Sequence, residues 1–283
     1  MEKTKVNGTE LEYEVTGTGE PVLLISTGPI RDSFFPLLNE SVLAEDYSLI
    51  RYRQRPLDQI TRQPVTFAEH AADAAGLLEH LGVRRAHVVG HSTGAVIALE
   101  LAVNYPAMVQ TLTLLEPPLF GVPSAGTFLE NLGPAFESYA AGHRELALKQ
   151  FLSYVCGLDW DTFRSVVEGR IPGEIERTLE HADNVFESYL PSLSSWQFGL
   201  DEAAKISQPV LSVVGSETNQ LFAEGQDVLH SWFPQVEDCE IEGVAHLLHM
   251  QRPEPVASGI AGFLAQNPMR KPRTAIRRPR ARV

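Results

Sequence analysis

The sequence predicts an α/β fold, in which a mostly parallel sheet carries helices on both faces. Short apolar runs rich in β-branched residues recur along the 283-residue chain, and each is followed by a turn and a helical pattern. The runs lack apolar–polar alternation, which is typical of parallel strands buried on both faces. Because strands alternate with helices in this way, we expect a doubly wound sheet.

The predicted strands begin with a hairpin, because Asn7-Gly8 separates two strand patterns and this dipeptide favours a type I′ turn. A strand is also expected within residues 236–246, ahead of a loop. The core strands between these two regions are PVLLIS (21–26), YSLIRY (47–52), AHVVGH (86–91), VQTLTLLE (109–116) and PVLSVVG (209–215).

Helices are predicted between the strands. Thr66 and Glu69 form a capping box that opens a helix with an apolar stripe. Residues 93–105 are apolar nearly all round, so this helix is expected to be buried. A last helix begins near Pro253–Pro255.

One long segment lacks strand patterns. Residues 118–207 contain helical stretches, at 143–156 and 174–190, and many aromatic side chains. We interpret this segment as a helical lid over the carboxyl ends of the strands, where open α/β sheets bind ligands. The core then comprises residues 1–117 and 208–266, and residues 267–283 form a basic, disordered tail.

The composition excludes several classes of protein. The chain is 43% hydrophobic and 21% charged, as globular proteins are, and no apolar run is long enough for a membrane span. The polar N-terminus argues against a secretory signal and two cysteines are too few for a disulfide framework, so we expect a cytoplasmic protein with reduced thiols. Outside the basic tail the chain is strongly acidic, which disfavours nucleic-acid and membrane partners. A homo-oligomer stays open.

Ser92 is the candidate nucleophile. It is the central residue of Gly90-His91-Ser92-Thr93-Gly94, between a predicted strand and a predicted helix. A G-x-S-x-G pattern in that context is typical of a nucleophile elbow, in which a strained turn raises the serine hydroxyl clear of the sheet. The two glycines avoid collisions with neighbouring elements.

A serine hydroxyl needs a base, and histidine is the usual one near neutral pH. Of nine histidines, His246 follows a predicted strand in a glycine-containing loop, from which it can reach a serine at the same edge of the sheet. His249, three residues on, is the rival candidate. The pair lacks the spacing of a zinc motif.

The elbow, the GVAH loop at 243–246 and the order of elements resemble the α/β-hydrolase superfamily with a helical cap, over residues 5–266. The resemblance implies a triad in the chain order nucleophile, acid, histidine. Family members often carry an aspartate three residues after the glycine that ends the penultimate strand, but this chain has Thr218 there. The acid is therefore expected at Glu116, which follows the strand after the elbow helix, with Glu217 as the alternative.

The resemblance also implies an oxyanion hole formed by the backbone N–H groups of Thr93 and Gly28, although Ser26-Thr27-Gly28-Pro29 departs from the usual His-Gly. Glu116, which follows the strand after the elbow helix, and the divergent loop at 26–29 make the chain similar to the zearalenone (resorcylic macrolactone) lactonases. Substrate contacts are then expected from Pro29, Phe120, Tyr189 and Trp196.

The sequence thus predicts a serine hydrolase with Ser92, His246 and Glu116 as its triad, acting on an ester or lactone of a bulky apolar or aromatic molecule. No metal and no organic cofactor is implied. Three other functions stay open on this fold: a cofactor-free dioxygenase, a carbon–carbon bond hydrolase, and a non-catalytic receptor for a small molecule.

Overall fold

The computed structural model describes residues 1–55 and 63–269, and within them eight strands form one sheet in the order β1-β2-β4-β3-β5-β6-β7-β8. The first two pairings, β1 with β2 and β2 with β4, are antiparallel, and the others are parallel. The predicted α/β class is confirmed. The strands are β1 (Glu2–Val6), β2 (Thr9–Thr16), β3 (Glu20–Ile25), β4 (Tyr47–Arg53), β5 (Ala86–His91), β6 (Val109–Leu115), β7 (Val210–Gly215) and β8 (Glu237–Ile241).

The hairpin turn has the backbone conformation that its sequence favours. Asn7 and Gly8 have φ angles of 48° and 81°, and both central residues of a type I′ turn require positive φ. Val6 pairs with Thr9 across the turn, which sets the register of β1 and β2.

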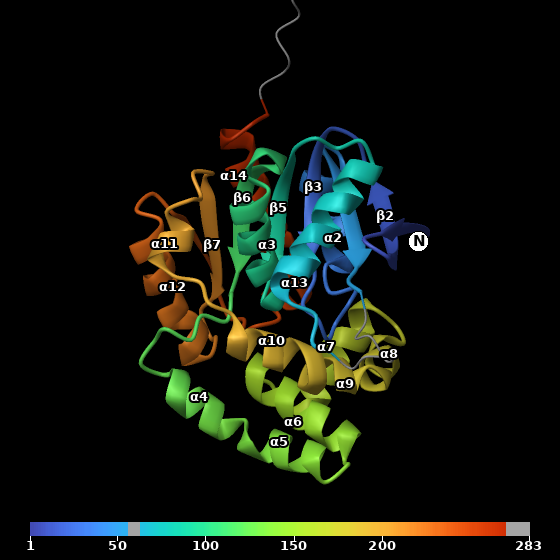
Figure 1. Ribbon diagram of the computed structural model, residues 1–283, viewed down its shortest axis with the longest axis vertical. Coiled ribbons are helices and arrows are strands. Elements are labelled where there is room, and N and C mark those ends of the chain that lie inside the picture. The colour runs from blue at the N-terminus through green and yellow to red at the C-terminus, as the bar shows by residue number, and fades with distance from the viewer. Residues whose placement is uncertain (56–62, 270–283) are drawn as a thin grey trace, which may run out of the picture.

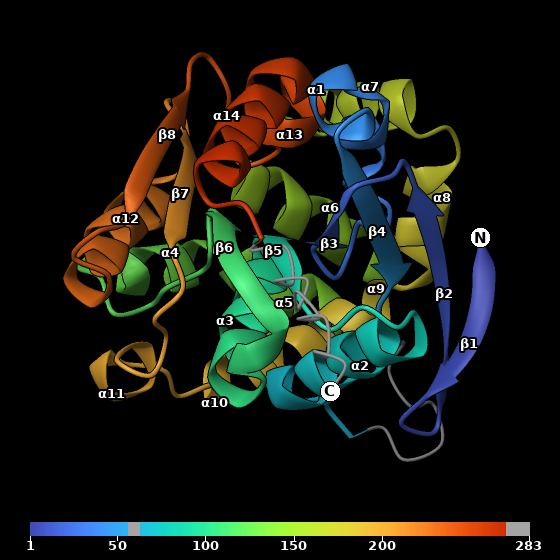
Figure 2. The same cartoon turned by 90° about the horizontal axis from the view of Figure 1, so that it is seen from above.

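Helices cover both faces of the sheet, as Figure 2 shows with α2 and α3 on one side and α1, α13 and α14 on the other. The predicted capping box is present, since the Thr66 hydroxyl accepts from the Glu69 N–H and the Glu69 carboxylate accepts from the Thr66 N–H. These helices are α1 (Ser41–Ala44), α2 (Phe67–His80), α3 (Thr93–Asn104), α12 (Gln220–Trp232), α13 (Leu248–Gln251) and α14 (Pro253–Gln266).

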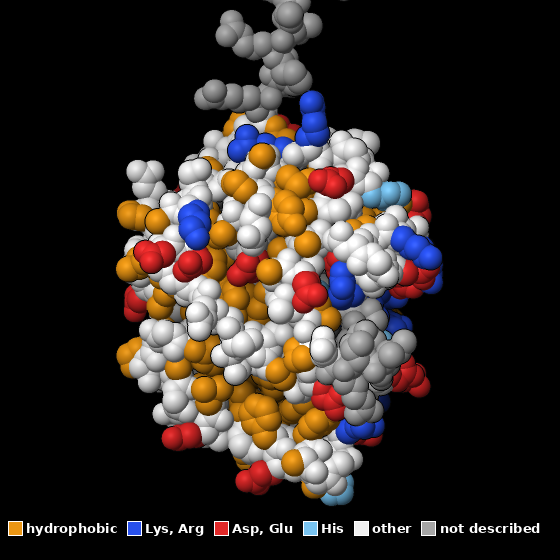
Figure 3. All heavy atoms as spheres, in the orientation of Figure 1, with side chains coloured by type: hydrophobic (Ala, Val, Ile, Leu, Met, Phe, Trp, Pro, Cys, Tyr) orange, Lys and Arg blue, Asp and Glu red, His pale blue; other side chains and the backbone are white. Residues whose placement is uncertain are grey.

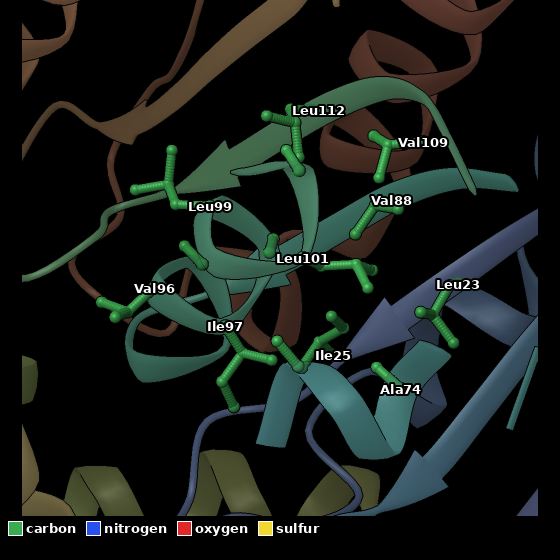
Figure 4. Packing of buried hydrophobic residues seen from close by; sticks show 14 of the residues in the cluster. Leu23, Ile25, Ala74, Val88, Val96, Ile97, Leu99, Leu101, Val109 and Leu112 are labelled. Carbon is green, nitrogen blue, oxygen red and sulfur yellow. The ribbon is translucent and has the colours of Figure 1, made fainter. Parts of the chain in front are cut away.

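The elbow helix α3 lies in the largest apolar cluster, where Val96, Ile97 and Leu101 pack against side chains of β3, β5 and β6 (Figure 4). All three side chains are completely buried. Burying a side chain of this size contributes about 1.5–3 kcal/mol, so the packing of α3 fixes the end of the helix that follows Ser92.

Apart from the last one, which lies beside β7, the helices between β6 and β7 lie across the carboxyl ends of the strands. They occupy the lower part of Figure 1, where Figure 3 shows hydrophobic side chains gathered at the surface. Leu129, Phe136, Leu146 and Leu200 are the exposed large apolar residues of this segment. The helices are α4 (Ala125–Asn131), α5 (Gly133–Ala140), α6 (Arg144–Cys156), α7 (Trp160–Arg170), α8 (Glu174–Glu180), α9 (Ala182–Asn184), α10 (Leu190–Ser195) and α11 (Leu200–Ala203).

The helical stretch expected over 174–190 is interrupted rather than continuous. It breaks at His181 and continues through a π-helical turn, Val185–Tyr189, into α10. Pro191 follows this turn at the start of α10. Proline has no N–H to donate to the preceding turn and its ring collides with the carbonyl four residues back, so the wider π-helical turn accommodates it.

Among the helices of the described residues, none combines the length and the apolar character that crossing a bilayer demands. The cysteines at 156 and 239 are free thiols. Of the tail predicted over 267–283, residues 270–283 lie outside the described residues, and the Met269 N–H donates to the Glu20 carboxylate at 2.9 Å.

Candidate active site

Ser92 lies at a sharp turn between β5 and α3. Its backbone has φ 54° and ψ −122°, a conformation that is strained for a residue with a side chain. The turn leaves no room for larger residues at its flanks, because a Cβ at Gly90 would collide with the backbone of Gly94 and a Cβ at Gly94 with the carbonyl of Ile25. The Ser92 N–H donates to the Leu115 carbonyl at 2.9 Å, which ties the turn to β6.

Glu116 follows β6 directly and its carboxylate is buried, with 2% of the residue exposed. One carboxylate oxygen, Oε2, lies 2.6 Å from Nδ1 of His246 and accepts from the Thr218 hydroxyl at 2.8 Å. The other, Oε1, accepts from the Gly215 N–H at 2.8 Å. These donors offset the cost of burying a carboxylate, which is high when the charge is unpaired.

The same contacts define the tautomer of His246. Since an ionised carboxylate only accepts hydrogen bonds, the proton of the neutral imidazole is on Nδ1 and Nε2 is free to accept one. The ring stacks on Phe222, with ring centroids 4.0 Å apart and planes at 14°. His246 thereby has a fixed orientation at the edge of the cavity that Ser92 also lines.

His249 and His91 form a buried layer beside His246. The His91 ring centroid lies 4.6 Å from that of His246 and 4.4 Å from that of His249. His91 Nε2 donates to the backbone carbonyl of His246 at 2.8 Å. Burial lowers the pKa of His91 well below its ordinary value and that of His249 to about 3, so both rings are neutral. In the described part of the chain, neither ring nitrogen of His249 has a hydrogen-bond partner.

The two alternatives for the acid occupy different environments. Glu217 is exposed at the surface. Its neighbour Thr218, which occupies the place where the resemblance led us to look for an aspartate, donates to the Glu116 carboxylate instead. The position after β7 therefore contributes a hydrogen-bond donor to a carboxylate that comes from β6.

The expected oxyanion donors lie next to each other. The Gly28 N–H donates to the Thr93 hydroxyl at 3.1 Å, which places the loop after β3 against the first turn of α3. The Thr93 N–H has no hydrogen-bond partner within residues 1–55 and 63–269. Since α3 begins at Thr93, this N–H belongs to the positive end of the helix dipole.

A cavity opens above Ser92, with about 720 Å³ of empty space including its mouth. Three of the four residues expected to contact substrate, Pro29, Phe120 and Tyr189, line it. Trp196 does not, because its indole N–H donates to Glu100 at 2.8 Å and its ring packs between Phe67 and Phe198. The other lining residues are mostly apolar and include Ile30, Pro118, Phe128, Leu129, Leu132, Phe151, Leu152, Val155, Cys156, Val185, Leu190, Leu193, Phe222 and Leu247.

Some residues of the site were not anticipated from the sequence. Phe222 lies in the first turn of the helix after β7, and its apolar character gave no reason to separate it from core residues. Gln54, just after β4, is 5% exposed and holds the loop after β3. An amide side chain directly after a predicted core strand is a sequence signal that could have identified it.

The chain belongs to the alpha/beta hydrolase fold family, whose model matches residues 25–253. It is 35% identical over 109 residues to a putative carbamate hydrolase of Azorhizobium caulinodans, covering 38% of this chain and 41% of that one. It is 37% identical over 125 residues to the rhodomycin D methylesterase of Streptomyces peucetius, covering 41% and 42%. The chain thus spans about two fifths of the length of these curated relatives.

Among solved structures, the chain is similar to a thermophilic esterase from Thermogutta terrifontis. The superposition has a TM-score of 0.74 and 24% sequence identity, and covers 94% of this chain and 99% of the esterase. At that identity the likeness shows the shared fold.

Proposed function

We propose that the protein is a serine hydrolase that cleaves an ester or lactone of a bulky apolar or aromatic molecule. The observation that carries this proposal is the 2.6 Å contact of Glu116 with His246, at the edge of a cavity that exposes the strained Ser92 turn. A nucleophile, a base and a group that orients the base are the three parts that acyl transfer needs.

In the proposed reaction, Ser92 Oγ attacks the substrate carbonyl while His246 Nε2 takes the hydroxyl proton. The Glu116 carboxylate stabilises the imidazolium that forms. The N–H groups of Thr93 and Gly28 stabilise the negative charge on the carbonyl oxygen. His246 then protonates the leaving alcohol, and a water molecule, deprotonated by the same nitrogen, releases the acid and regenerates Ser92.

The substrate class is inferred from the cavity and from the similarity of the triad layout to the zearalenone lactonases. Apart from the groups near Ser92 the walls offer aliphatic and aromatic side chains, which favour an apolar, ring-containing acyl or alcohol part. The rhodomycin D methylesterase, by its name, acts on a methyl ester. We propose residues 118–207 as the lid that encloses such a substrate.

Two measurements test the proposal. An aryl fluorophosphonate should add once to the wild-type protein and not to Ser92→Ala, as read by intact mass spectrometry and peptide mapping. A series of aryl esters and a resorcylic macrolactone should then be hydrolysed, with the macrolactone opening to its hydroxy acid. Labelling at another residue, or no hydrolysis by a labelled enzyme, would contradict it.

The same experiment separates the remaining readings of the fold. A cofactor-free dioxygenase would turn over without phosphonate labelling and would consume oxygen. A carbon–carbon bond hydrolase would be labelled but would cleave a diketone-type substrate in preference to the esters. A receptor would bind the macrolactone without product.

A further inference from the structure

The loop after β3, which carries Gly28, is attached to the helical segment between β6 and β7 through one side chain. The Tyr189 ring lies directly against Gly28, so that a Cβ at this glycine would overlap the ring carbons. Tyr189 is the last residue of the π-helical turn and is 6% exposed. The close approach explains why position 28 is a glycine, since alanine would displace either the loop or the ring.

Gln54 fixes the same loop from the other side. Its amide Nε2 donates to the Ser26 carbonyl at 2.6 Å, two residues before Gly28. Its amide oxygen accepts from the Tyr189 hydroxyl at 2.9 Å. In addition, the Arg31 guanidinium donates to the backbone carbonyl of Gln54 at 3.1 Å, from the far end of the loop. Gln54 therefore holds both ends of the loop and the ring that presses on its centre.

The polar side-chain groups of Gln54 and Tyr189 have partners, which matters because both residues are buried. An unpaired buried amide or hydroxyl costs roughly 1–3 kcal/mol, so the two side chains have few alternative positions. His70 closes the arrangement, because its ring stacks on Tyr189 at 5.6 Å with planes at 12°. The Tyr189 ring is held between Gly28 and His70.

We propose that Gln54 and Tyr189 are positioning residues for the oxyanion-binding N–H of Gly28. The π-helical turn, Val185–Tyr189, thereby helps to assemble the part of the site that binds the oxyanion. The inference rests on the proposed serine hydrolase function. Neither residue has to touch the reacting atoms. Their effect is to hold the Gly28 N–H where the tetrahedral oxyanion forms. The contact of the Tyr189 ring with Gly28 thus connects residues 118–207 to the loop after β3.

The position of that N–H is consequential because it already has a competing partner, the Thr93 hydroxyl at 3.1 Å. An oxyanion takes over the N–H when the loop keeps its place and the charge develops within hydrogen-bond distance. Losing one such donor lowers kcat by roughly 10²–10³. A loop that is displaced rather than removed should lose part of that factor.

Gln54→Met tests the proposal, since it keeps the length of the side chain and removes both amide contacts, while the backbone bond to Arg31 stays. We expect kcat to fall roughly 10–100-fold with KM within threefold, because the donor acts in the transition state. Affinity for an aryl trifluoromethyl ketone, which forms a tetrahedral adduct with serine, should fall in parallel. The pH profile of kcat/KM should keep its shape, because the contacts between Glu116 and His246 are untouched.

Tyr189→Phe is the second variant, for the case in which Gln54→Met fails to fold. It keeps the ring on Gly28 and removes only the bond to Gln54, so kcat should fall roughly 3–10-fold. The matched control is Ser192→Ala. Its hydroxyl also joins this segment to the core, but by a bond of 2.9 Å to the Val65 carbonyl rather than to the loop after β3. It should leave kcat and ketone affinity within about twofold.

Unchanged kcat in both variants would overturn the inference while leaving the hydrolase function intact, because the wild type would still be labelled at Ser92. A fall in kcat with unchanged ketone affinity would also overturn it, since the effect would then not lie in oxyanion binding. If the wild type neither reacts with phosphonate nor hydrolyses an ester, the proposed function and this inference fail together.

Discussion

The two halves of the candidate site are attached to different parts of the molecule. The acid–base half, with Glu116 and His246, is fixed by the ends of β6, β7 and β8, since its bonds run to Gly215 and Thr218. The oxyanion half, with Gly28, follows β3 and is pressed into place by Tyr189 from the π-helical turn.

This difference distinguishes site residues that are positioned by strand pairing from those that are positioned by packing of the helical segment between β6 and β7. Adjacent parallel strands bring their carboxyl ends together whenever their register is set, and Leu115 pairs with Val213 as Gly215 pairs with Ile241. Groups at such positions meet through local pairing. Gly28 and Tyr189 are 161 positions apart in the numbering and meet through packing of the helical segment. We therefore expect the acid–base half to tolerate changes in that segment better than the oxyanion half does.

The largest effect is expected at Ser92, on which both halves of the site act. Ser92→Ala removes the nucleophile while preserving the turn and the packing of α3. Because the members of a triad act as a unit, kcat should fall by roughly 10⁴–10⁶. Steady-state kinetics on an aryl ester, with folding checked by circular dichroism, is the measurement. More than about a tenth of wild-type activity would exclude Ser92 as nucleophile.

The next effect is confined to the acid–base half. Glu116→Gln keeps the shape of the side chain but removes the charge that opposes the imidazolium, and it can favour the wrong tautomer of His246. A comparable change in a serine protease lowers kcat about 10⁴-fold, and we expect roughly 10³–10⁴ here. The matched variant Glu217→Gln changes an exposed carboxylate of the alternative and should cost less than about threefold. The reverse pattern would assign the acid to Glu217.

The sequence predicts these two halves unequally. The strands, the elbow and the turn at Asn7-Gly8 follow from local pattern, and the place of Glu116 follows from its position after a buried strand. The contacts of Tyr189 could not be predicted, because they depend on how a segment that breaks at His181 and widens into a π-helical turn packs on the loop after β3. Trp196 shows the same limit, since an aromatic residue of the segment can face Glu100 as readily as the cavity.

A carboxylate moved from the end of β6 to the end of β7 should have a smaller effect. It tests whether kcat depends on which strand carries the acid or only on the presence of its charge. The Thr218 hydroxyl lies 2.8 Å from the oxygen of Glu116 that contacts His246. An aspartate at 218 should therefore bring a carboxylate near the same imidazole nitrogen. In the background of Glu116→Ala, Thr218→Asp should restore kcat on the order of 100-fold relative to Glu116→Ala alone, part of the loss that a missing acid causes. Thr218→Asn in the same background is the uncharged control and should restore little.

The last comparison is between two buried histidines, one beside each half of the site. His249 lies beside His91 in the acid–base half, and His70 lies beside Tyr189 in the oxyanion half. Burial lowers the pKa of His249 and that of His70 to about 3, and the positive charge of Arg55 adds to the effect at His70. The unfolded chain, with histidine pKa near 6.5, binds these protons first as the pH falls. Each group therefore gives stability that is complete above about pH 6.5 and is lost as the pH falls toward 3.

The expected magnitude is about 1.4 kcal/mol per pH unit for each group, or about 2 kcal/mol at pH 5. His249→Leu and His70→Leu should each flatten the pH dependence of the unfolding free energy by that slope, measured by urea denaturation between pH 7.5 and 5, a range in which the depressed carboxylates stay ionised. Because burial lowers the pKa of both histidines to about 3, the two variants should flatten the slope equally. A slope that stays at the wild-type value in either variant would contradict a buried, neutral ring at that position.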